Sequence, residues 1–129
     1  MNNKKKTKQY IWIAVIVVIL LGGAWWVMHK PTVAAGAYDQ FAQCLTSKGV
    51  AMYGAYWCPH CANQKKLFGN SYRFIKYVEC ANDPQTCINA GVNGYPTWKF
   101  ADGSKLEGEQ DLQALADKTS CPLTQTSQQ

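Results

Sequence analysis

Two cysteines three positions apart, Cys58 and Cys61, are the residues of this 129-residue chain whose types and spacing are best suited to chemistry. They follow the apolar run 50–56, which is typical of a buried strand, and a helix is expected from Cys58 to Phe68. A cysteine at a helix N-terminus lies beside unpaired amides and the positive end of the helix dipole. Such positions lower a thiol pKa from about 8.5 to roughly 3.5–7.5. The spacing therefore predicts an exposed nucleophile at Cys58 and a partner thiol at Cys61 that closes or releases a disulfide.

The elements that must position this pair alternate between helices and strands along the chain. We expect helices at 38–45, 58–68 and 85–90 and after Asp111, and strands at 50–56, 77–80, 97–100 and 105–107. Asp111 is expected to cap the last helix, and residues 101–104 to join the last two strands as a hairpin. Lys65 and Lys66 are expected on the solvated face of the second helix. This order of elements predicts a small α/β layer fold.

The net charge of +5 comes from the N-terminal end of the chain. Five of the 13 basic residues precede the first acidic residue, Asp39, and the other 8 are balanced by 8 acidic residues. These five are Lys4, Lys5, Lys6, Lys8 and Lys30. A neutral remainder gives no electrostatic case for nucleic-acid binding. The basic end instead predicts membrane topology.

Residues 11–28 contain no charged side chain and would span roughly 27 Å as a helix, close to the thickness of a bilayer core. Trp25 and Trp26 lie near one end of this run, where amphipathic rings favour the membrane interface. The lysines before it predict a cytoplasmic N-terminus and an extracytoplasmic domain. The alternative is a cleaved signal peptide with an apolar core at 10–21 and small residues for cleavage at 35–37.

These patterns predict five successive parts of the chain. They are a cytoplasmic basic N-terminus at 1–10, a transmembrane anchor (or uncleaved signal) at 11–28, a linker at 29–37, a domain at 38–122 and a disordered tail at 123–129. Six cysteines in a small exported domain fit an oxidising compartment, and their number alone allows 15 pairings. Zinc is a weaker alternative, because no second tight cysteine pair accompanies Cys58 and Cys61.

The segment Gly94-Tyr95-Pro96-Thr97 is the second motif, because a proline after an aromatic residue at the start of a strand is a candidate for a cis peptide bond. Together with Trp57-Cys58-Pro59-His60-Cys61 it resembles the thioredoxin superfamily, over about residues 38–121. The resemblance implies a thioredoxin-like three-layer fold with a mixed central sheet and no bound cofactor or metal. It also implies that Pro96 is cis opposite the cysteines and that the backbone at Tyr95 pairs with the substrate chain.

The pair Pro59-His60 between the cysteines is similar to that of DsbA-type periplasmic oxidants. An imidazole beside Cys58 would stabilise its thiolate and make the disulfide more oxidising. Trp57 borders the same site, so Trp57, Pro59 and His60 are expected to tune it.

A more detailed likeness is to the thioredoxin-like domain attached to vitamin K epoxide reductase (VKOR) homologues, and it covers residues 52–61, 66–69, 77–80 and 94–98. That family passes oxidising equivalents from a quinone-coupled four-helix membrane enzyme to exported proteins. Because this chain holds one apolar run, the likeness implies a separate VKOR-like or DsbB-like membrane partner. The function implied is a membrane-anchored, extracytoplasmic thiol–disulfide oxidoreductase that oxidises the thiols of exported proteins. The alternatives are a reductase or isomerase fed with electrons across the membrane, and a non-catalytic binding module.

The resemblance also places the remaining cysteines and exposes one departure. The topology of a thioredoxin-like sheet implies structural disulfides Cys44–Cys121 and Cys80–Cys87, although the second could alternatively relay electrons to the Cys58–Cys61 pair. Thioredoxin and DsbA carry a buried carboxylate six residues before the first cysteine, where this chain has Met52. Proton transfer at Cys61 must then use another group.

Overall fold

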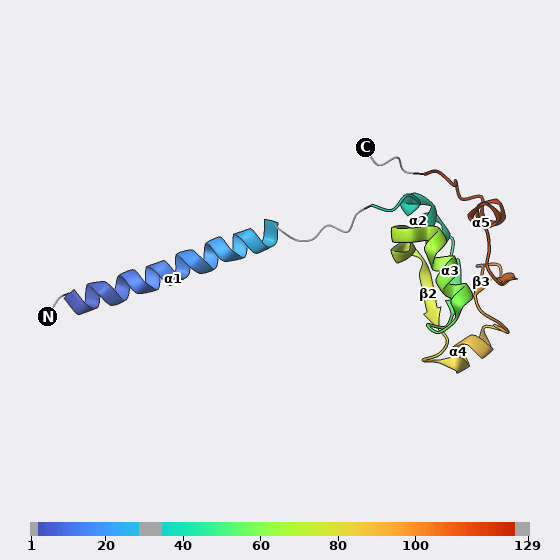
Figure 1. Ribbon diagram of the computed structural model, residues 1–129, viewed down its shortest axis with the longest axis horizontal. Helices are drawn as coiled ribbons and strands as arrows, with labels where there is room; N and C mark the ends of the chain where they lie inside the picture. The colour runs from blue at the N-terminus through green and yellow to red at the C-terminus, as the bar shows by residue number, and fades with distance from the viewer. Residues whose placement is uncertain (1–2, 29–34, 126–129) are drawn as a thin grey trace. The chain divides into compact units, whose positions relative to one another are not determined.

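The computed structural model describes residues 3–28 and 35–125, which belong to two compact units, Met1–Val33 and Ala34–Gln129 (Figure 1). Most of the predicted linker, at 29–34, and the end of the predicted tail, at 126–129, lie outside the described residues. The limits proposed for the linker and the tail therefore stay predictions.

The described residues of the first unit form the helix α1 (Asn3–Met28), which begins before the apolar run and includes the lysines that precede it. Its segment Lys6–Trp25 has a mean hydropathy of 1.7 and is long and apolar enough to cross a membrane. Side chains at 6–25 are exposed, so they are not the core of a folded domain. A signal sequence has the same length and composition, and either interpretation fits this helix.

The second unit is a mixed α/β fold, as the alternation of helices and strands predicts. Its elements are α2 (Asp39–Ser47), β1 (Ala51–Gly54), α3 (Pro59–Phe68), the 3₁₀ helix η1 (Gly69–Phe74), β2 (Lys76–Glu79), α4 (Pro84–Asn89), β3 (Thr97–Lys99), β4 (Lys105–Glu107) and α5 (Leu112–Thr119). The sequence did not indicate η1. Asp111 occupies the N-cap position of α5, but its side chain makes no capping hydrogen bond.

The four strands form one mixed sheet in the order β2-β1-β3-β4, which confirms the predicted fold class. β1 pairs in parallel with β2 and antiparallel with β3, and β4 returns antiparallel to β3. The pairings Gly54↔Glu79 and Tyr53↔Thr97 place the ends of β1 and β2 and the beginning of β3 at one edge of the sheet. The loops that leave this edge carry Cys58, Cys80 and the Tyr95-Pro96 segment. The two predicted motifs therefore meet, because β1 ends where the antiparallel strand β3 begins.

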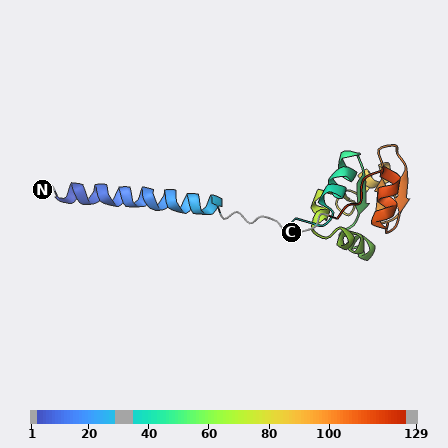
Figure 2. The ribbon, with the colours of Figure 1, turned by 90° about the horizontal axis from the view of Figure 1, so that it is seen from above.

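Helices pack on this sheet around an aromatic core. The ring of Phe68, at the end of α3, stacks on Phe41 of α2 with centroids 6.0 Å apart and lies 5.8 Å from the ring of Trp98 on β3. Met52 and Leu115 are fully buried in the same cluster. Burial of each such side chain contributes about 1.5–3 kcal/mol, so this cluster fixes α3, and with it Cys61, against the sheet. The C-terminal elements, coloured orange to red, lie together on one side of the domain (Figures 1 and 2).

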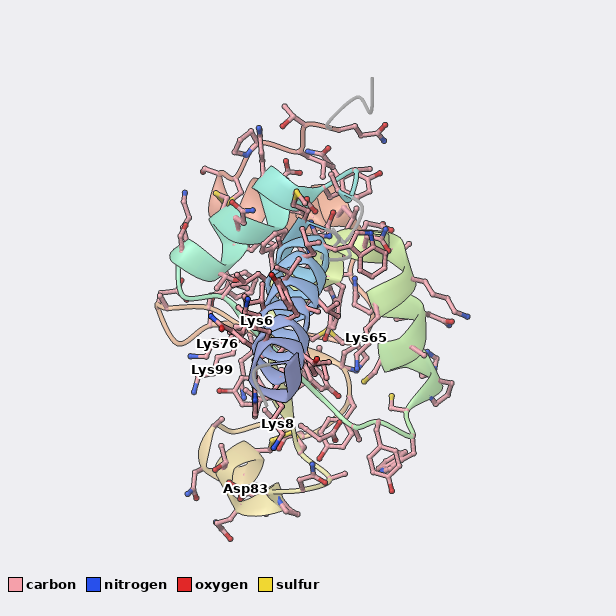
Figure 3. The ribbon with its side chains drawn as sticks, turned by 90° about the vertical axis from the view of Figure 1, so that its left-hand side faces the viewer. Lys6, Lys8, Lys65, Lys76, Asp83 and Lys99 are labelled. Atoms are coloured by element: carbon pink, nitrogen blue, oxygen red, sulfur yellow. A yellow bond between two sulfur atoms is a disulfide. The ribbon has the colours of Figure 1, made fainter. Side chains whose placement is uncertain are left out.

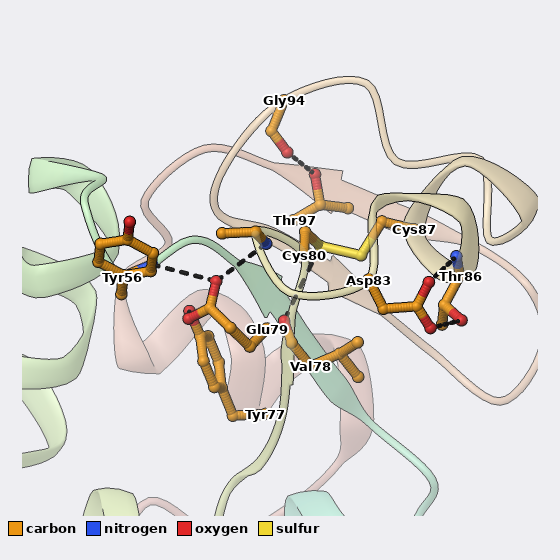
Figure 4. The surroundings of a disulfide bond; sticks show 11 residues. Tyr56, Tyr77, Val78, Glu79, Cys80, Asp83, Thr86, Cys87, Gly94 and Thr97 are labelled. Carbon is orange, nitrogen blue, oxygen red and sulfur yellow. Dashed lines mark hydrogen bonds between the residues drawn. A yellow bond between two sulfur atoms is a disulfide. The ribbon is translucent and has the colours of Figure 1, made fainter.

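Two disulfides join the cysteines that the resemblance paired. Cys44–Cys121 links α2 to the segment after α5 across a sequence separation of 77, and Cys80–Cys87 links the end of β2 to α4 across a separation of 7 (Figure 4). In the chain-entropy model the longer loop stabilises by about 4 kcal/mol and the shorter by about 2 kcal/mol. Asp83 caps α4 by accepting a 3.2 Å hydrogen bond from the backbone of Thr86.

Candidate functional site

Cys58 is the N-cap residue of α3. Its backbone is extended (φ −80°, ψ 118°), and Pro59, at the first helical position, has the fixed φ that a helix start favours. The Cys58 Sγ accepts a 3.4 Å hydrogen bond from the backbone N–H of Cys61. The strand ends at Gly54 rather than Tyr56, because the N–H of Cys58 turns back to the carbonyl of Ala55 at 3.1 Å. A sulfur at this position lies where the unpaired amides of the helix stabilise negative charge.

The two thiols of this pair are free and differ in accessibility. The expectation of an exposed Cys58 is wrong, since it is 6% exposed, although it remains more accessible than Cys61 at 1%. Cys61 lies one turn into α3, where the helix packs on the sheet. Burial raises the pKa of the Cys61 thiol to about 11. The pair therefore combines a capped outer sulfur with an inner thiol that stays protonated at neutral pH.

The segment before β3 covers the outer sulfur. The Tyr95–Pro96 peptide bond is cis, and the Cys58 S–H lies 3.7 Å from the carbonyl oxygen of Tyr95, to which it donates. The rings of Trp57 and Tyr95 meet edge to face with centroids 6.0 Å apart. Trp57 is itself 62% exposed, so it forms an open aromatic border to the site. The contact with Tyr95 explains why Cys58 is less accessible than its position at a helix N-terminus suggests.

His60 is held by a residue that the sequence did not indicate. Its Nδ1 lies 2.6 Å from Oε1 of Glu109, and both side chains are partly exposed. The hydrogen bonds from His60 and Asn63 hold the pKa of the Glu109 carboxyl below its ordinary value. The imidazole thus has a carboxylate partner on the segment after β4. Its predicted role in tuning Cys58 stays a prediction.

Gln64 connects α3 to the segment that follows β4 through a buried side chain. The side chain is fully buried, and its amide donates to the carbonyl of Gln110 at 2.9 Å and accepts from the N–H of Gln110 at 2.6 Å. Because both polar atoms of this buried amide are hydrogen-bonded, they fix the position of α3, and any displacement of the helix would leave them unpaired. No residue pattern in the sequence indicated this contact.

Gly54, at the end of β1, lies directly beneath the inner thiol. A Cβ at this position would be 2.7 Å from the Sγ of Cys61 and 3.2 Å from the hydroxyl oxygen of Tyr77. The first distance is shorter than van der Waals contact allows and the second is at about its limit, so the site requires a glycine here. Tyr77 in turn donates a 3.0 Å hydrogen bond to Oε2 of Glu79. The sequence singled out neither Gly54 nor this pair as functional residues.

Lys65 does not lie on a purely solvated face as predicted. It is half-buried, with its Nζ 3.9 Å from the ring centroid of Tyr77 and 5.4 Å from that of Tyr72. Lys66, its neighbour, is exposed as expected. Lys65 therefore brings a positive charge close to the inner thiol, where it acts to lower the pKa of Cys61 against the larger effect of burial.

The arrangement is suited to disulfide exchange. Two thiols one helical turn apart can close a disulfide, and the adjacent backbone of a cis X–Pro segment borders the sulfur that an incoming chain would reach first. Among residues 3–28 and 35–125 no three His, Cys, Asp or Glu side chains are grouped so that they could hold a metal ion.

No family model matches the chain, but comparison with known proteins finds relatives that include the following two. The chain is 38% identical over 96 residues to a thiol-disulfide oxidoreductase, LTO1, of Arabidopsis thaliana, which covers 67% of this chain and 25% of that protein. It is 32% identical over 82 residues to a probable protein disulfide-isomerase, ER-60, of Schistosoma mansoni, which covers 55% of this chain and 17% of that protein. The matched part thus spans a quarter or less of the length of either relative.

Proposed function

We propose that this protein, whose fold and relatives support the thioredoxin-like superfamily, is a thiol–disulfide oxidoreductase with Cys58 and Cys61 as its redox pair. The observation that carries the proposal is the position of Cys58, which caps α3 through its sulfur and lies 3.7 Å from the carbonyl of Tyr95. The names of both relatives agree with disulfide chemistry.

In the proposed cycle the oxidised protein accepts two electrons from a pair of substrate thiols. A substrate thiolate attacks the Sγ of Cys58, the Cys58–Cys61 bond breaks, and Cys61 leaves as a thiolate that takes up a proton. The substrate's second thiolate then attacks the mixed disulfide. The substrate leaves with a new disulfide, and Cys58 is released as a thiolate next to the amides of α3. Pro96 and Tyr95 would hold the substrate chain beside this sulfur.

We further propose that the domain works outside the cytoplasm, tethered by α1. The apolar segment Lys6–Trp25 supports a membrane anchor, and the preceding lysines support a cytoplasmic N-terminus. The two disulfides at Cys44–Cys121 and Cys80–Cys87 fit an oxidising compartment. The proposed oxidant that restores the Cys58–Cys61 disulfide is a separate quinone-linked membrane protein of the VKOR or DsbB type.

The second candidate is a reductase or isomerase, which the match to a protein disulfide-isomerase favours. The two directions differ in reduction potential. A value near −120 mV would place the pair with the oxidant DsbA, a value near −180 mV with protein disulfide isomerase, and one near −270 mV with thioredoxin. Because His60 would favour the thiolate of Cys58, we expect a value at the oxidising end of this range.

The test uses full-length protein in detergent, equilibrated with glutathione buffers of known potential. Alkylation of free thiols followed by mass spectrometry gives the fraction of the Cys58–Cys61 pair that is oxidised in each buffer. The oxidised protein is then mixed with a reduced dithiol peptide, and Cys58→Ala serves as the inactive variant. Oxidation of the peptide by Cys58→Ala at the wild-type rate would end the catalytic interpretation and leave a binding module.

A further inference from the structure

The inner thiol must exchange a proton in every cycle, yet it is enclosed by the fold. Cys61 is 1% exposed, and burial raises its pKa to about 11. Only the thiolate forms or leaves a disulfide at a useful rate. A group within the domain must therefore take the proton when Cys61 attacks and return it when Cys61 leaves. At position 52, where the resemblance leads one to look for a carboxylate, the side chain is the thioether of Met52, which cannot serve.

The sheet face beneath α3 carries a carboxylate on the neighbouring strand instead. In the parallel pairing of β1 with β2, Met52 lies opposite Tyr77 and Gly54 lies opposite Glu79. Because alternate residues of a strand share a face, these four positions lie on the same side of the sheet. Cys61 approaches this side, since its Sγ and the hydroxyl of Tyr77 converge on the space above Gly54.

Glu79 is held in one orientation by three hydrogen bonds. Its Oε1 accepts from the backbone N–H groups of Tyr56 at 3.2 Å and Ala81 at 3.1 Å, while Oε2 accepts from the hydroxyl of Tyr77 at 3.0 Å (Figure 4). The carboxylate therefore turns one oxygen to the backbone of the loops and the other to the phenol. Tyr77 and Glu79 are both half-buried, so neither side chain is fully enclosed by the fold as Cys61 is.

The other titratable groups around Cys61 are less suited to accept its proton. Lys65 projects from α3 (Figure 3). Its Nζ lies over the ring of Tyr77, and an ammonium group favours an anion nearby but has no lone pair to accept a proton. Tyr72, on η1, donates its hydroxyl to the sulfur of Met52 at 3.7 Å, and burial raises its pKa. Cys58 is the reaction partner itself. His60 turns to Glu109.

We propose that Tyr77 and Glu79 form a proton relay for Cys61. When Cys61 attacks a mixed disulfide at Cys58, its S–H proton passes to the hydroxyl oxygen of Tyr77 as that hydroxyl gives its own proton to Glu79. The Cys58–Cys61 bond forms, and the other thiol leaves with the electron pair of the broken bond. When the disulfide is reduced, Cys61 leaves as a thiolate and the protons return along the same path. Burial raises the pKa of Tyr77, so the phenol is never left as a free anion at neutral pH.

This inference deepens the proposed function and rests on it, and one experiment separates the two. Reduced full-length protein is mixed with excess 5,5′-dithiobis(2-nitrobenzoate) in a stopped-flow instrument. The first thionitrobenzoate is released when Cys58 attacks the reagent, at a rate that depends on reagent concentration. The second is released when Cys61 attacks the mixed disulfide, at a rate that does not.

The variants Glu79→Gln and Tyr77→Phe test the relay. The glutamine keeps an oxygen for the amides of Tyr56 and Ala81, and the phenylalanine keeps the ring under Lys65. We expect the second phase to slow about 10- to 100-fold at pH 7, at the low end of general acid–base effects. The difference should shrink towards pH 11, where Cys61 ionises unaided. The first phase should change less than twofold.

Matched controls carry the same changes on the opposite face of the sheet. Tyr53 adjoins Gly54 on β1, and Glu107 lies opposite Thr97, the partner of Tyr53. Tyr53→Phe and Glu107→Gln should leave both phases within twofold of the wild type. The wild-type protein adds an independent readout, which is the pH dependence of the rate of the second phase. With a relay this rate levels off between pH 6 and 9, whereas without one it rises tenfold per pH unit as the thiol ionises.

Each outcome decides one question. A second phase unchanged in Glu79→Gln and Tyr77→Phe, or slowed equally at every pH, would overturn the relay while leaving the oxidoreductase intact. A wild-type rate that rises tenfold per unit from pH 6 to 9 would overturn it as well. A first phase that keeps the wild-type rate in Cys58→Ala, where Cys61 is the remaining free thiol, would instead overturn the proposed function.

Discussion

The backbone N–H of Cys61 donates a hydrogen bond to the sulfur of Cys58 across 3.4 Å. The outer sulfur is therefore held by the backbone of the inner residue and not by its side chain. We predict that Cys61→Ala keeps the cap and the reactivity of Cys58 but cannot resolve a mixed disulfide. With an oxidised peptide substrate it should accumulate the Cys58 adduct, visible as a mass increase on intact-protein mass spectrometry. Cys58→Ala should form no adduct. An adduct in that variant would show that Cys58 is not the nucleophile.

Gly54→Ala tests the close packing beneath the inner thiol. The new methyl group would meet the Sγ of Cys61 at 2.7 Å and the phenol of Tyr77 at about the limit of contact. We expect a loss of about 1–3 kcal/mol in the free energy of unfolding, as for other overpacked cores, measured by denaturant titration. The same change at Gly94, where a Cβ would have open space, serves as the control and should stay within about 0.5 kcal/mol. Equal losses at both sites would contradict the packing described here.

The buried thiol predicts a dependence of stability on pH in the protein with this pair reduced. Burial raises the pKa of Cys61 from 9.0 to about 11, so the unfolded chain releases this proton at a lower pH than the folded one. The stabilisation is complete below about pH 9 and is lost as the pH rises towards 11. Denaturation midpoints at pH 8 to 10 should fall more steeply in the wild type than in Cys61→Ala. If the midpoints of the two proteins changed in parallel with pH, Cys61 would ionise as readily in the folded state as in the unfolded state.

The two structural disulfides should contribute unequally. Cys44–Cys121 closes a loop of 77 residues and Cys80–Cys87 one of 7. Replacing both cysteines by alanine should cost about 4 kcal/mol in the first case and about 2 kcal/mol in the second, as chemical denaturation would measure. If the shorter bridge proved the more stabilising, its contribution would come from contacts of α4 rather than from the unfolded chain.

The fold class and the placing of two thiols at the start of α3 could be predicted because they depend on local patterns. Alternating apolar runs set the order of the elements, and the spacing of Cys58 and Cys61 sets their geometry within one helical turn. The partners beneath and beside the pair could not be predicted in this way. Glu79 comes under α3 through the register of β1 with β2, and Glu109 meets His60 across 49 positions of sequence.

The environment of Cys58 shows the same limit. A helix N-terminus predicts an accessible sulfur, whereas the structure leaves 6% of the residue exposed because the Tyr95 segment covers it. Lys65 likewise follows the helix pattern of a surface residue but lies over the ring of Tyr77. In each case the deciding contact comes from another element of the fold. The residues around Cys58 and Lys65 in the sequence do not indicate that contact.

The most direct test follows the disulfide from this protein to a substrate. Oxidised full-length protein is incubated with a reduced dithiol peptide, quenched in acid, alkylated and mapped by mass spectrometry. We predict that one disulfide appears in the peptide for each protein, that Cys58 and Cys61 become alkylated, and that Cys44–Cys121 and Cys80–Cys87 stay closed. Alkylation of Cys80 and Cys87 while Cys58–Cys61 remains oxidised would contradict the assignment of the redox pair.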